Sequence, residues 1–206
     1  AFARVCPRED ESPSRRTARA PVALPPDMLA RVFTVMTVAA ITASLLFNFT
    51  TNGNAQLLAE RFAGILEDPA VLGALLAAIY VVASLAQVVV GRLIDRMAFK
   101  ALNIGLSLAL VPLLGLAAHA QGWWLFALLL AVMVLIFGSV PFTDAMIARY
   151  IDDRIRSRVA GMRLAVSSGF SGLAVWLLGP MVKGMGFATM LWVLAGVALC
   201  KAAVVL

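Results

Sequence analysis

The chain has 206 residues, of which 62% are hydrophobic and only 14% charged, and its formal net charge is +6. This is too much apolar material for one soluble domain, and runs such as "LFALLLAVMVLIF" are continuous where a lipid-spanning β-barrel needs alternation, so both classes are excluded. Nucleic-acid binding is not indicated either, because the positions of the cations fit membrane topology. The composition therefore predicts an all-α polytopic membrane protein.

The leading segment, residues 1–27, differs from the rest of the chain. It holds five prolines, five arginines and an acidic "EDE", with almost nothing to bury. Such a composition predicts a disordered, basic cytosolic segment and fits neither a signal peptide nor a transit peptide. The chain opens at Ala1 without an initiator methionine and stops at Leu206 while still apolar. We therefore expect it to be a fragment of a longer protein.

Residues 28–206 are expected to form one bundle of transmembrane helices. A helix needs about 20 mostly apolar residues to cross a bilayer, and six stretches meet that requirement. They are 29–52, 71–91, 101–118, 123–148, 159–179 and 187–206. The start of the second stretch is marked by "EDPAVLG", in which Asp68 is expected to cap the helix and Pro69 to open it.

The cations are distributed unevenly among the connections. Of the seventeen Lys and Arg residues, fourteen lie in or next to the leading segment and the second and fourth connections, counting Arg31 and Arg163 near the starts of the stretches that follow. The first, third and fifth connections hold only two. Because cytoplasmic loops carry the excess of positive charge, this pattern predicts an integral protein of the cell (inner) membrane with both chain ends in the cytosol.

Metal and disulfide chemistry find little support in the sequence. Cys6 and Cys200 are the only cysteines and His119 is the only histidine, with no CxxC spacing. Neither a disulfide framework nor a metal site follows from such residues. We expect no cofactor and no metal ion.

The second connection concentrates charge in "GRLIDRMAFK", residues 91–100. Holding the topology explains Arg92, Arg96 and Lys100. It does not explain Asp95, whose carboxylate sits at the negative end of a helix dipole and at the edge of the lipid. Asp95 should therefore have a partner, either Arg92 one turn earlier or the N-terminus of a neighbouring helix.

This stretch resembles the signature loop of the major facilitator superfamily, Gly-x-Leu-x-Asp-Arg-x-Gly followed by basic residues. The matching residues are Gly91, Leu93, Asp95, Arg96 and Lys100. Ala98 replaces the usual second glycine and Phe99 a usual basic residue, as is typical of the weaker second copy of the loop. The resemblance implies helices seven to twelve of a twelve-helix transporter, with residues 1–27 as the central cytosolic loop.

A second match is "PFTDAMIARYIDDRIRSRVAGMR", which resembles the passage from the tenth to the eleventh helix of that superfamily. The internal pseudo-symmetry of the superfamily implies that Asp144 receives Arg92 or Arg96 when the cytosolic side is closed. The alternative is that Asp144 faces lipid headgroups.

Polar residues at helical spacing indicate which faces line a path. Asn48 and Asn52 in the first stretch and Tyr80 and Gln87 in the second are the predicted substrate-cavity residues, although hydrogen bonds between helices would also satisfy the amides. Pro141 is expected to bend the fourth stretch toward the cavity. The third and sixth stretches look like outer, lipid-facing helices. The resemblance implies that the first and fourth stretches line the cavity and that the second and fifth form the interface with the other half.

Two other functions compete with transport. "GFSG" with Ser171 and "AHAQG" with His119 resemble the motifs of rhomboid-like intramembrane serine proteases, although rhomboids place the serine first in the chain. A non-transporting membrane scaffold or receptor is the other alternative.

We therefore expect the chain to belong to a secondary active transporter that moves a small molecule by alternating access. It is not expected to be an enzyme. Its expected partners are the small-molecule substrate, membrane lipid and a missing N-terminal six-helix half, and no nucleic acid. The sequence does not reveal the substrate, the direction of transport or a coupling ion.

Overall fold

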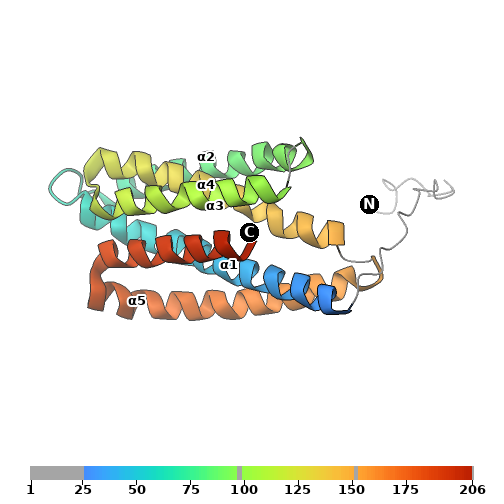
Figure 1. Cartoon of the computed structure of the whole chain (residues 1–206). Coiled ribbons are helices and arrows are strands. Elements are labelled where there is room, and N and C mark those ends of the chain that lie inside the picture. The colour runs from blue at the N-terminus through green and yellow to red at the C-terminus, as the bar shows by residue number, and fades with distance from the viewer. Residues whose placement is uncertain (1–25, 97–98, 151–152, 206) are drawn as a thin grey trace, which may run out of the picture.

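The computed structural model describes residues 26–96, 99–150 and 153–205, and within helices it leaves out the side chains of 26–33, 36, 95, 99, 143–144, 146–150, 153–156, 163 and 205. Five helices follow one another: α1 (Pro26–Arg61), α2 (Pro69–Arg96), α3 (Phe99–His119), α4 (Gly122–Tyr150) and α5 (Asp153–Val205) (Figure 1). No strand occurs in these ranges, which confirms the all-α prediction. The predicted start of α2 is also confirmed, because Pro69 opens the helix and Asp68 Oδ1 accepts a hydrogen bond from the Ala70 amide at 2.9 Å.

α5 consists of two helical legs joined by a sharp turn at Gly186. The backbone there has φ 76° and ψ 164°, a conformation that L side chains disfavour and glycine adopts at no steric cost. The chain reverses at this residue (Figure 1), so that residues 153–185 form a first leg and residues 187–205 a second leg. The two legs correspond to the predicted stretches 159–179 and 187–206.

Four helices in the described part of the chain are long and apolar enough to cross a membrane. The qualifying segments are 69–94, 100–119, 122–142 and 157–204. The last has 48 residues, more than twice the length of one crossing, and it contains the turn at Gly186. α1, many of whose first side chains lie outside the description, is not among the four. These helices are compatible with an integral membrane protein.

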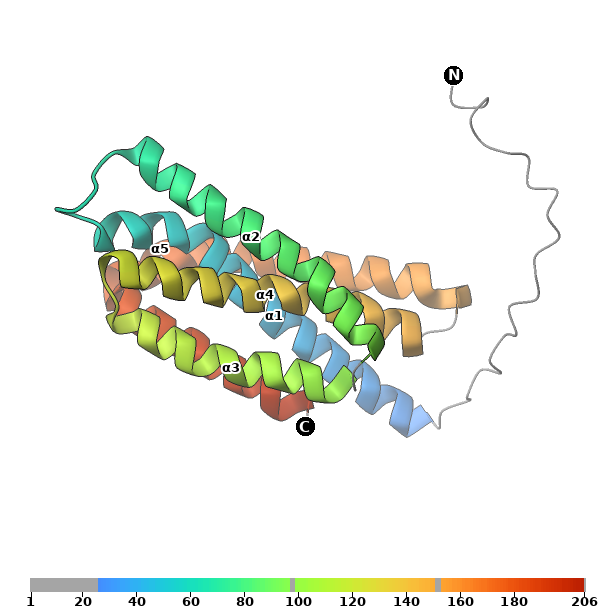
Figure 2. The same cartoon turned by 90° about the horizontal axis from the view of Figure 1, so that it is seen from above.

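The helices are arranged around α1 and α4 (Figure 2). α1 packs against the first leg of α5, and α4 packs against α2. α3 packs against α4 and against the second leg of α5, where Gly115 meets Trp192. One side of the bundle is therefore formed by α2, α4, α1 and the first leg, and α3 and the second leg lie behind them.

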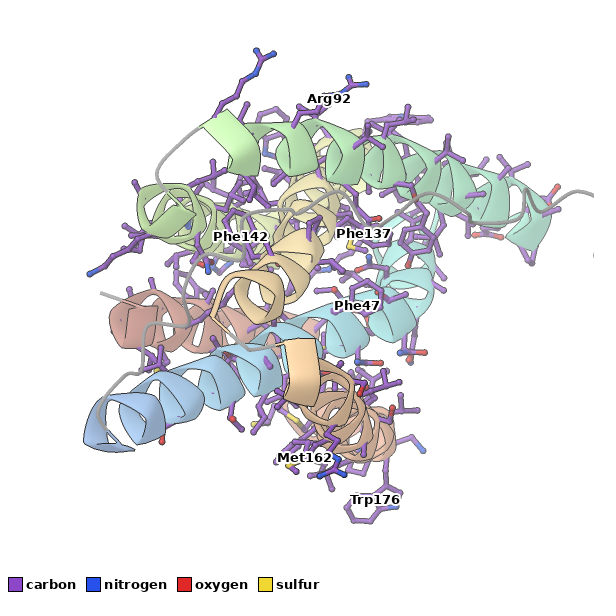
Figure 3. All side chains as sticks on the ribbon, turned by 90° about the vertical axis from the view of Figure 1, so that its right-hand side faces the viewer. Phe47, Arg92, Phe137, Phe142, Met162 and Trp176 are labelled. Atoms are coloured by element: carbon purple, nitrogen blue, oxygen red, sulfur yellow. The ribbon has the colours of Figure 1, made fainter. Side chains whose placement is uncertain are left out.

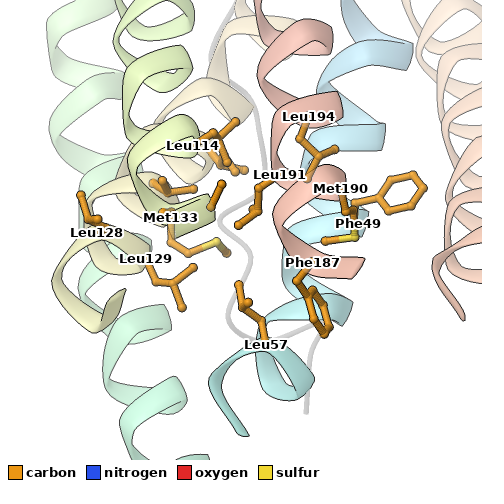
Figure 4. Packing of buried hydrophobic residues seen from close by; sticks show 14 of the residues in the cluster. Phe49, Leu57, Leu114, Leu128, Leu129, Met133, Phe187, Met190, Leu191 and Leu194 are labelled. Carbon is orange, nitrogen blue, oxygen red and sulfur yellow. The ribbon is translucent and has the colours of Figure 1, made fainter. Parts of the chain in front are cut away.

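The interior is filled by apolar side chains from all five helices, several of which are shown in Figure 4. Leu57 of α1, Leu114 of α3, Met133 of α4 and Leu191 of the second leg are all essentially inaccessible. If the bundle lies in lipid, burying such side chains gains little hydrophobic free energy, because lipid tails are as apolar as leucine. Its stability then depends on close van der Waals packing and on hydrogen bonds between helices.

Polar residues of α3 and of the second leg are turned inward. Asn103, Ser107 and Lys201 are all at most 5% exposed. The exposed large side chains of the same segments are apolar, namely Leu108, Leu116, Trp192, Val193 and Leu199. The large exposed side chains of these segments are thus apolar, and the expectation that they are outer, lipid-facing helices stays a prediction. An ammonium exposed to the bilayer centre would cost about 3 kcal/mol, which favours the inward position of Lys201.

The contact between α4 and α2 leaves no room for a side chain at Gly138. A Cβ atom there would lie 3.0 Å from Cγ2 of Val90, a buried β-branched residue that cannot easily rotate away. We expect Gly138→Ala to lower the free energy of unfolding by about 1–3 kcal/mol, measured by denaturation in detergent. Gly105→Ala in α3 is the matched control, since nothing lies within 4 Å of its Cβ position. Equal stability of the two variants would contradict this packing.

Candidate functional site

The first polar group joins α1 to the first leg of α5. Asn48 Nδ2 donates hydrogen bonds to Ser171 Oγ at 2.8 Å and to the Ser44 carbonyl at 2.8 Å. The Ser44 hydroxyl lies 3.2 Å from Ser171 Oγ and accepts a hydrogen bond from Ser167 Oγ at 3.1 Å. These four residues form the α1–α5 clamp. Asn48, a predicted cavity residue, therefore also fastens two helices together, by bonds worth roughly 0.6 kcal/mol each in a membrane bundle.

The second polar group lies where α1 meets α2. The Tyr80 hydroxyl donates a hydrogen bond to the Thr51 carbonyl at 2.9 Å, and the Asn54 side chain lies beside the same hydroxyl. Thr51 Oγ1 and Asn54 Nδ2 are buried, yet neither atom forms a hydrogen bond within the described structure. Asn54 as a whole is only 1% exposed. Thr51, Asn54 and Tyr80 are called the amide–hydroxyl cluster. It holds two buried polar atoms without a well-formed hydrogen bond, although the Tyr80 oxygen lies beside the Asn54 side chain.

Three aromatic rings from three helices adjoin this cluster. The Phe137 ring of α4 lies 5.3 Å from that of Phe47 in α1 and 6.0 Å from that of Tyr80 in α2, with an angle of 18° between the last two. Phe47, Thr51 and Asn54 follow at helical intervals of four and three residues, so they share one side of α1. In Figure 3, Phe47 and Phe137 face each other between their helices. The cluster therefore combines polar groups with an aromatic wall.

The unpaired hydroxyl of Thr51 differs from those of other threonines in α1. Thr42 and Thr50 donate hydrogen bonds to backbone carbonyls of their own helix, at 2.9 Å to Val38 and 2.7 Å to Leu46. A buried hydroxyl or amide without a partner costs about 1–3 kcal/mol. Unpaired buried groups of this kind are expected to lower stability, and such groups are often found at functional sites.

A third polar group lies on the exterior of α1. Asn52 and Gln56 are exposed one turn apart, and the half-buried Asn48 precedes them by another turn. These three residues are called the open face of α1. Trp123 packs edge-on against Phe62 at 5.5 Å, and tryptophans favour the membrane–water interface. Asn52 lies ten residues, or about 15 Å along the helix, from Phe62. If Trp123 marks one membrane–water interface, Asn52 would lie near the middle of the bilayer.

The large exposed side chains of the neighbouring helices are mostly apolar, although Ser84 of α2 and Ser168 of the first leg are also exposed. Val81, Leu85 and Val88 of α2 are each more than half exposed, and Trp176 of the first leg is 70% exposed. Trp176 and Met162 point away from the bundle in Figure 3. The amides of the open face contrast with these surfaces at comparable depth.

The predicted cavity residues are divided among several environments. Asn48 belongs to both the clamp and the open face, Asn52 to the open face, and Tyr80 to the amide–hydroxyl cluster. Gln87 and Pro141 are half-buried in α2 and α4. α4 continues through Pro141 as one helical element to Tyr150.

The residues of the signature-like loop are described only in part. Those with described side chains are Gly91, Arg92, Leu93, Arg96 and Lys100. Arg92 and Arg96 are exposed, and Arg92 extends away from the bundle in Figure 3. The side chains of Asp95 and Asp144 lie outside the described part of the structure, so the pairing of Asp144 with Arg92 or Arg96 stays a prediction.

The serine and histidine of the protease-like motifs have different partners. Ser171 takes part in the clamp, whereas His119 Nε2 accepts a hydrogen bond from Trp192 Nε1 at 3.4 Å, near the Gly186 turn. Ser171 precedes Gly186 by fifteen residues, about 22 Å along the first leg. The structure does not bring this pair together.

Metal ligands are not clustered in the described residues, where no three His, Cys, Asp or Glu side chains are placed to hold an ion. No protein-family model matches the sequence. No curated protein matches it either.

The unpaired hydroxyl of Thr51 leads to a stability prediction. Thr51→Val keeps the shape of the side chain but removes the unsatisfied group, so we expect it to raise the free energy of unfolding in detergent by about 1 kcal/mol. Thr50→Val is the matched control, because it removes a hydroxyl that is already hydrogen-bonded, and it should leave stability unchanged or lower. A Thr51→Val variant less stable than Thr50→Val would show that the hydroxyl has a partner.

Proposed function

We propose that the chain forms the C-terminal six-helix half of a major facilitator type transporter, which moves a small molecule across the cell membrane by alternating access. The observation that carries the proposal is the open face of α1, where Asn52 and Gln56 are exposed about 15 and 9 Å along the helix from Phe62. The Asn52 amide nitrogen donates one hydrogen bond to the Asn48 carbonyl at 2.8 Å. The other polar groups of this face would lose their hydrogen bonds with water in lipid, so contact with water or another protein surface suits the face better. A second six-helix half placed against it encloses a polar path.

The arrangement of the helices also supports the proposal. α1 and α4 are neighbours, α2 and the first leg of α5 flank them, and α3 and the second leg lie behind. This is the division into cavity, interface and outer helices that the resemblance implies. With α1 as one crossing and α5 as two, the chain crosses the membrane six times and keeps both ends in the cytosol.

The competing functions fit these observations less well. A protease of the rhomboid type needs Ser171 and His119 within hydrogen-bonding reach, whereas each is engaged with other residues far apart. A scaffold has no need of amides facing outward at mid-membrane depth. We therefore propose transport and no enzymatic activity.

Access of water to the open face provides the test. Cys6 and Cys200 are replaced by serine, and single cysteines are introduced as Asn52→Cys or Val81→Cys in the native host, where a partner half is present. Both positions are exposed, at about 15 and 18 Å along their helices from the same end of the bundle. Maleimides react with thiolates, which do not form in hydrocarbon. We expect a membrane-impermeant maleimide to label Asn52→Cys and to spare Val81→Cys.

Two outcomes of this labelling contradict the proposal. If Asn52→Cys is as unreactive as Val81→Cys from both sides of the membrane, no aqueous path reaches the open face. If both react equally, the exterior of α2 is not in lipid.

We further propose that Asp95, Arg96 and Asp144 act as a latch, which closes the cytosolic side and separates when that side opens. Weakening such an ion pair by about 0.5–1 kcal/mol shifts the equilibrium between the two states. In the Asn52→Cys background, Asp95→Asn should therefore increase labelling from the cytosolic side about two- to fivefold. Arg158→Gln, at an exposed cation outside the latch, is the control. Unchanged labelling in Asp95→Asn would remove the latch and leave the transporter proposal standing.

A further inference from the structure

We infer that the amide–hydroxyl cluster of Thr51, Asn54 and Tyr80 is the binding site for an uncharged, ring-bearing solute with a carbonyl or similar acceptor group. The inference rests on the proposed function, and it names the class of substrate that the transporter carries. Four features of the site support it: the unused donors, the absence of charge, the aromatic wall and the bond that closes the site.

The first feature is a set of buried donor groups without a hydrogen bond. Asn54 Nδ2 is buried without a hydrogen bond, and an amide nitrogen can be satisfied only by an acceptor atom. Thr51 Oγ1 is also buried and unpaired, and it can either donate or accept. The Tyr80 hydroxyl already donates its proton to the Thr51 carbonyl, so it has only acceptor capacity left. A solute with an acceptor oxygen beside a polar hydrogen would satisfy all three groups.

The surroundings of the site carry no charge. Residues 34–59 of α1, 69–91 of α2 and 122–142 of α4 contain no Asp, Glu, Lys, Arg or His. A charged solute entering this region would leave its hydration shell and find no counter-charge, at a cost of several kcal/mol. The chemistry of the site therefore selects a neutral solute.

The aromatic side chains beside the cluster are the reason to expect a ring in the solute. Tyr80 and Phe137 lie nearly parallel and Phe47 is tilted against Phe137, so rings from three helices pack against one another beside the cluster. Offset-stacked or edge-on contacts between rings contribute about 0.5–1.5 kcal/mol beyond the burial of apolar area. A planar ring joined to the acceptor group gains these contacts while the polar end reaches Asn54 and Thr51.

The bond between Tyr80 and Thr51 closes the site. Asn54 is almost fully buried, so a solute reaches it only when α2 moves away from α1 and the Tyr80 hydroxyl releases the Thr51 carbonyl. The described structure then corresponds to the closed form of this site, and the same hydroxyl that ties α1 to α2 is left free to meet the solute.

The test uses three probes of the same shape and different charge: benzamide, benzoate and benzamidine. At neutral pH they are uncharged, anionic and cationic, and each has a planar head on a phenyl ring. Their dissociation constants are measured by NMR titration of the purified full chain in detergent, with its partner half where one co-purifies. We expect benzamide to bind at least about tenfold more tightly than either charged probe, because only it avoids the burial of an unpaired charge.

Two variants test whether benzamide binds at the amide–hydroxyl cluster. Thr51→Val and Asn54→Leu each remove one donor, so each should weaken benzamide binding about three- to tenfold. Thr50→Val should leave it unchanged, because that hydroxyl is bonded to the Leu46 carbonyl of its own helix. Where Asn54→Leu fails to fold, Thr51→Val decides the question, since it preserves the shape of the side chain.

Several results would overturn the inference. They are equal binding of the three probes, failure of benzamide to bind, or the same affinity in Thr51→Val as in Thr50→Val. The assay measures binding without flux, so such a result leaves the labelling of Asn52→Cys unaffected. Conversely, specific benzamide binding without labelling of Asn52→Cys would keep the site and refute the transport path.

Discussion

The need of polar groups for hydrogen-bond partners in apolar surroundings governs this structure. α1 carries amides and hydroxyls on several of its faces, and the helices around it are largely apolar. Toward α5, Asn48 and three serines satisfy one another. Thr50 is satisfied by its own helix. Thr51 and Asn54 keep unpaired atoms. In the proposed function, the hydrogen-bond partner of these two groups is the bound solute.

The packing around α1 holds these groups in position. The α1–α5 clamp fixes the rotation of α1, so that the side bearing Phe47, Thr51 and Asn54 faces α2 and α4. The close approach of Gly138 to Val90 brings α4 against α2 and so places Phe137 between Phe47 and Tyr80. Close contacts with α4 and α5 thus hold α1 and α2 in place around the amide–hydroxyl cluster. In the described part of the chain, the hydrogen bond from the Tyr80 hydroxyl to the Thr51 carbonyl links α1 to α2, and a contact of this kind can break and reform.

The proposed transporter joins these features in one mechanism. The open face supplies a polar boundary for a path, the uncharged cluster selects a neutral solute, and the charged turn after α2 lies at the cytosolic end. The hydrogen bond between Tyr80 and Thr51 would couple the presence of a solute to the separation of α1 and α2. Movement of the two halves then needs no charge at the binding site itself, only differential contacts in the two states.

The sequence by itself determined the helical class, most helix positions and the start of α2 at Asp68 and Pro69, because apolar run length and capping are local properties. It also brought out Asn48, Asn52 and Tyr80 as polar groups in apolar stretches. It did not single out Asn54, Phe47 or Phe137, and it did not predict the burial of Lys201. Only the tertiary structure decided that Asn48 is satisfied by Ser171, 123 positions along the chain, while Thr51 and Asn54 stay unpaired. Local spacing places a side chain on a helix face, but the partner it meets there depends on which helix packs against that face.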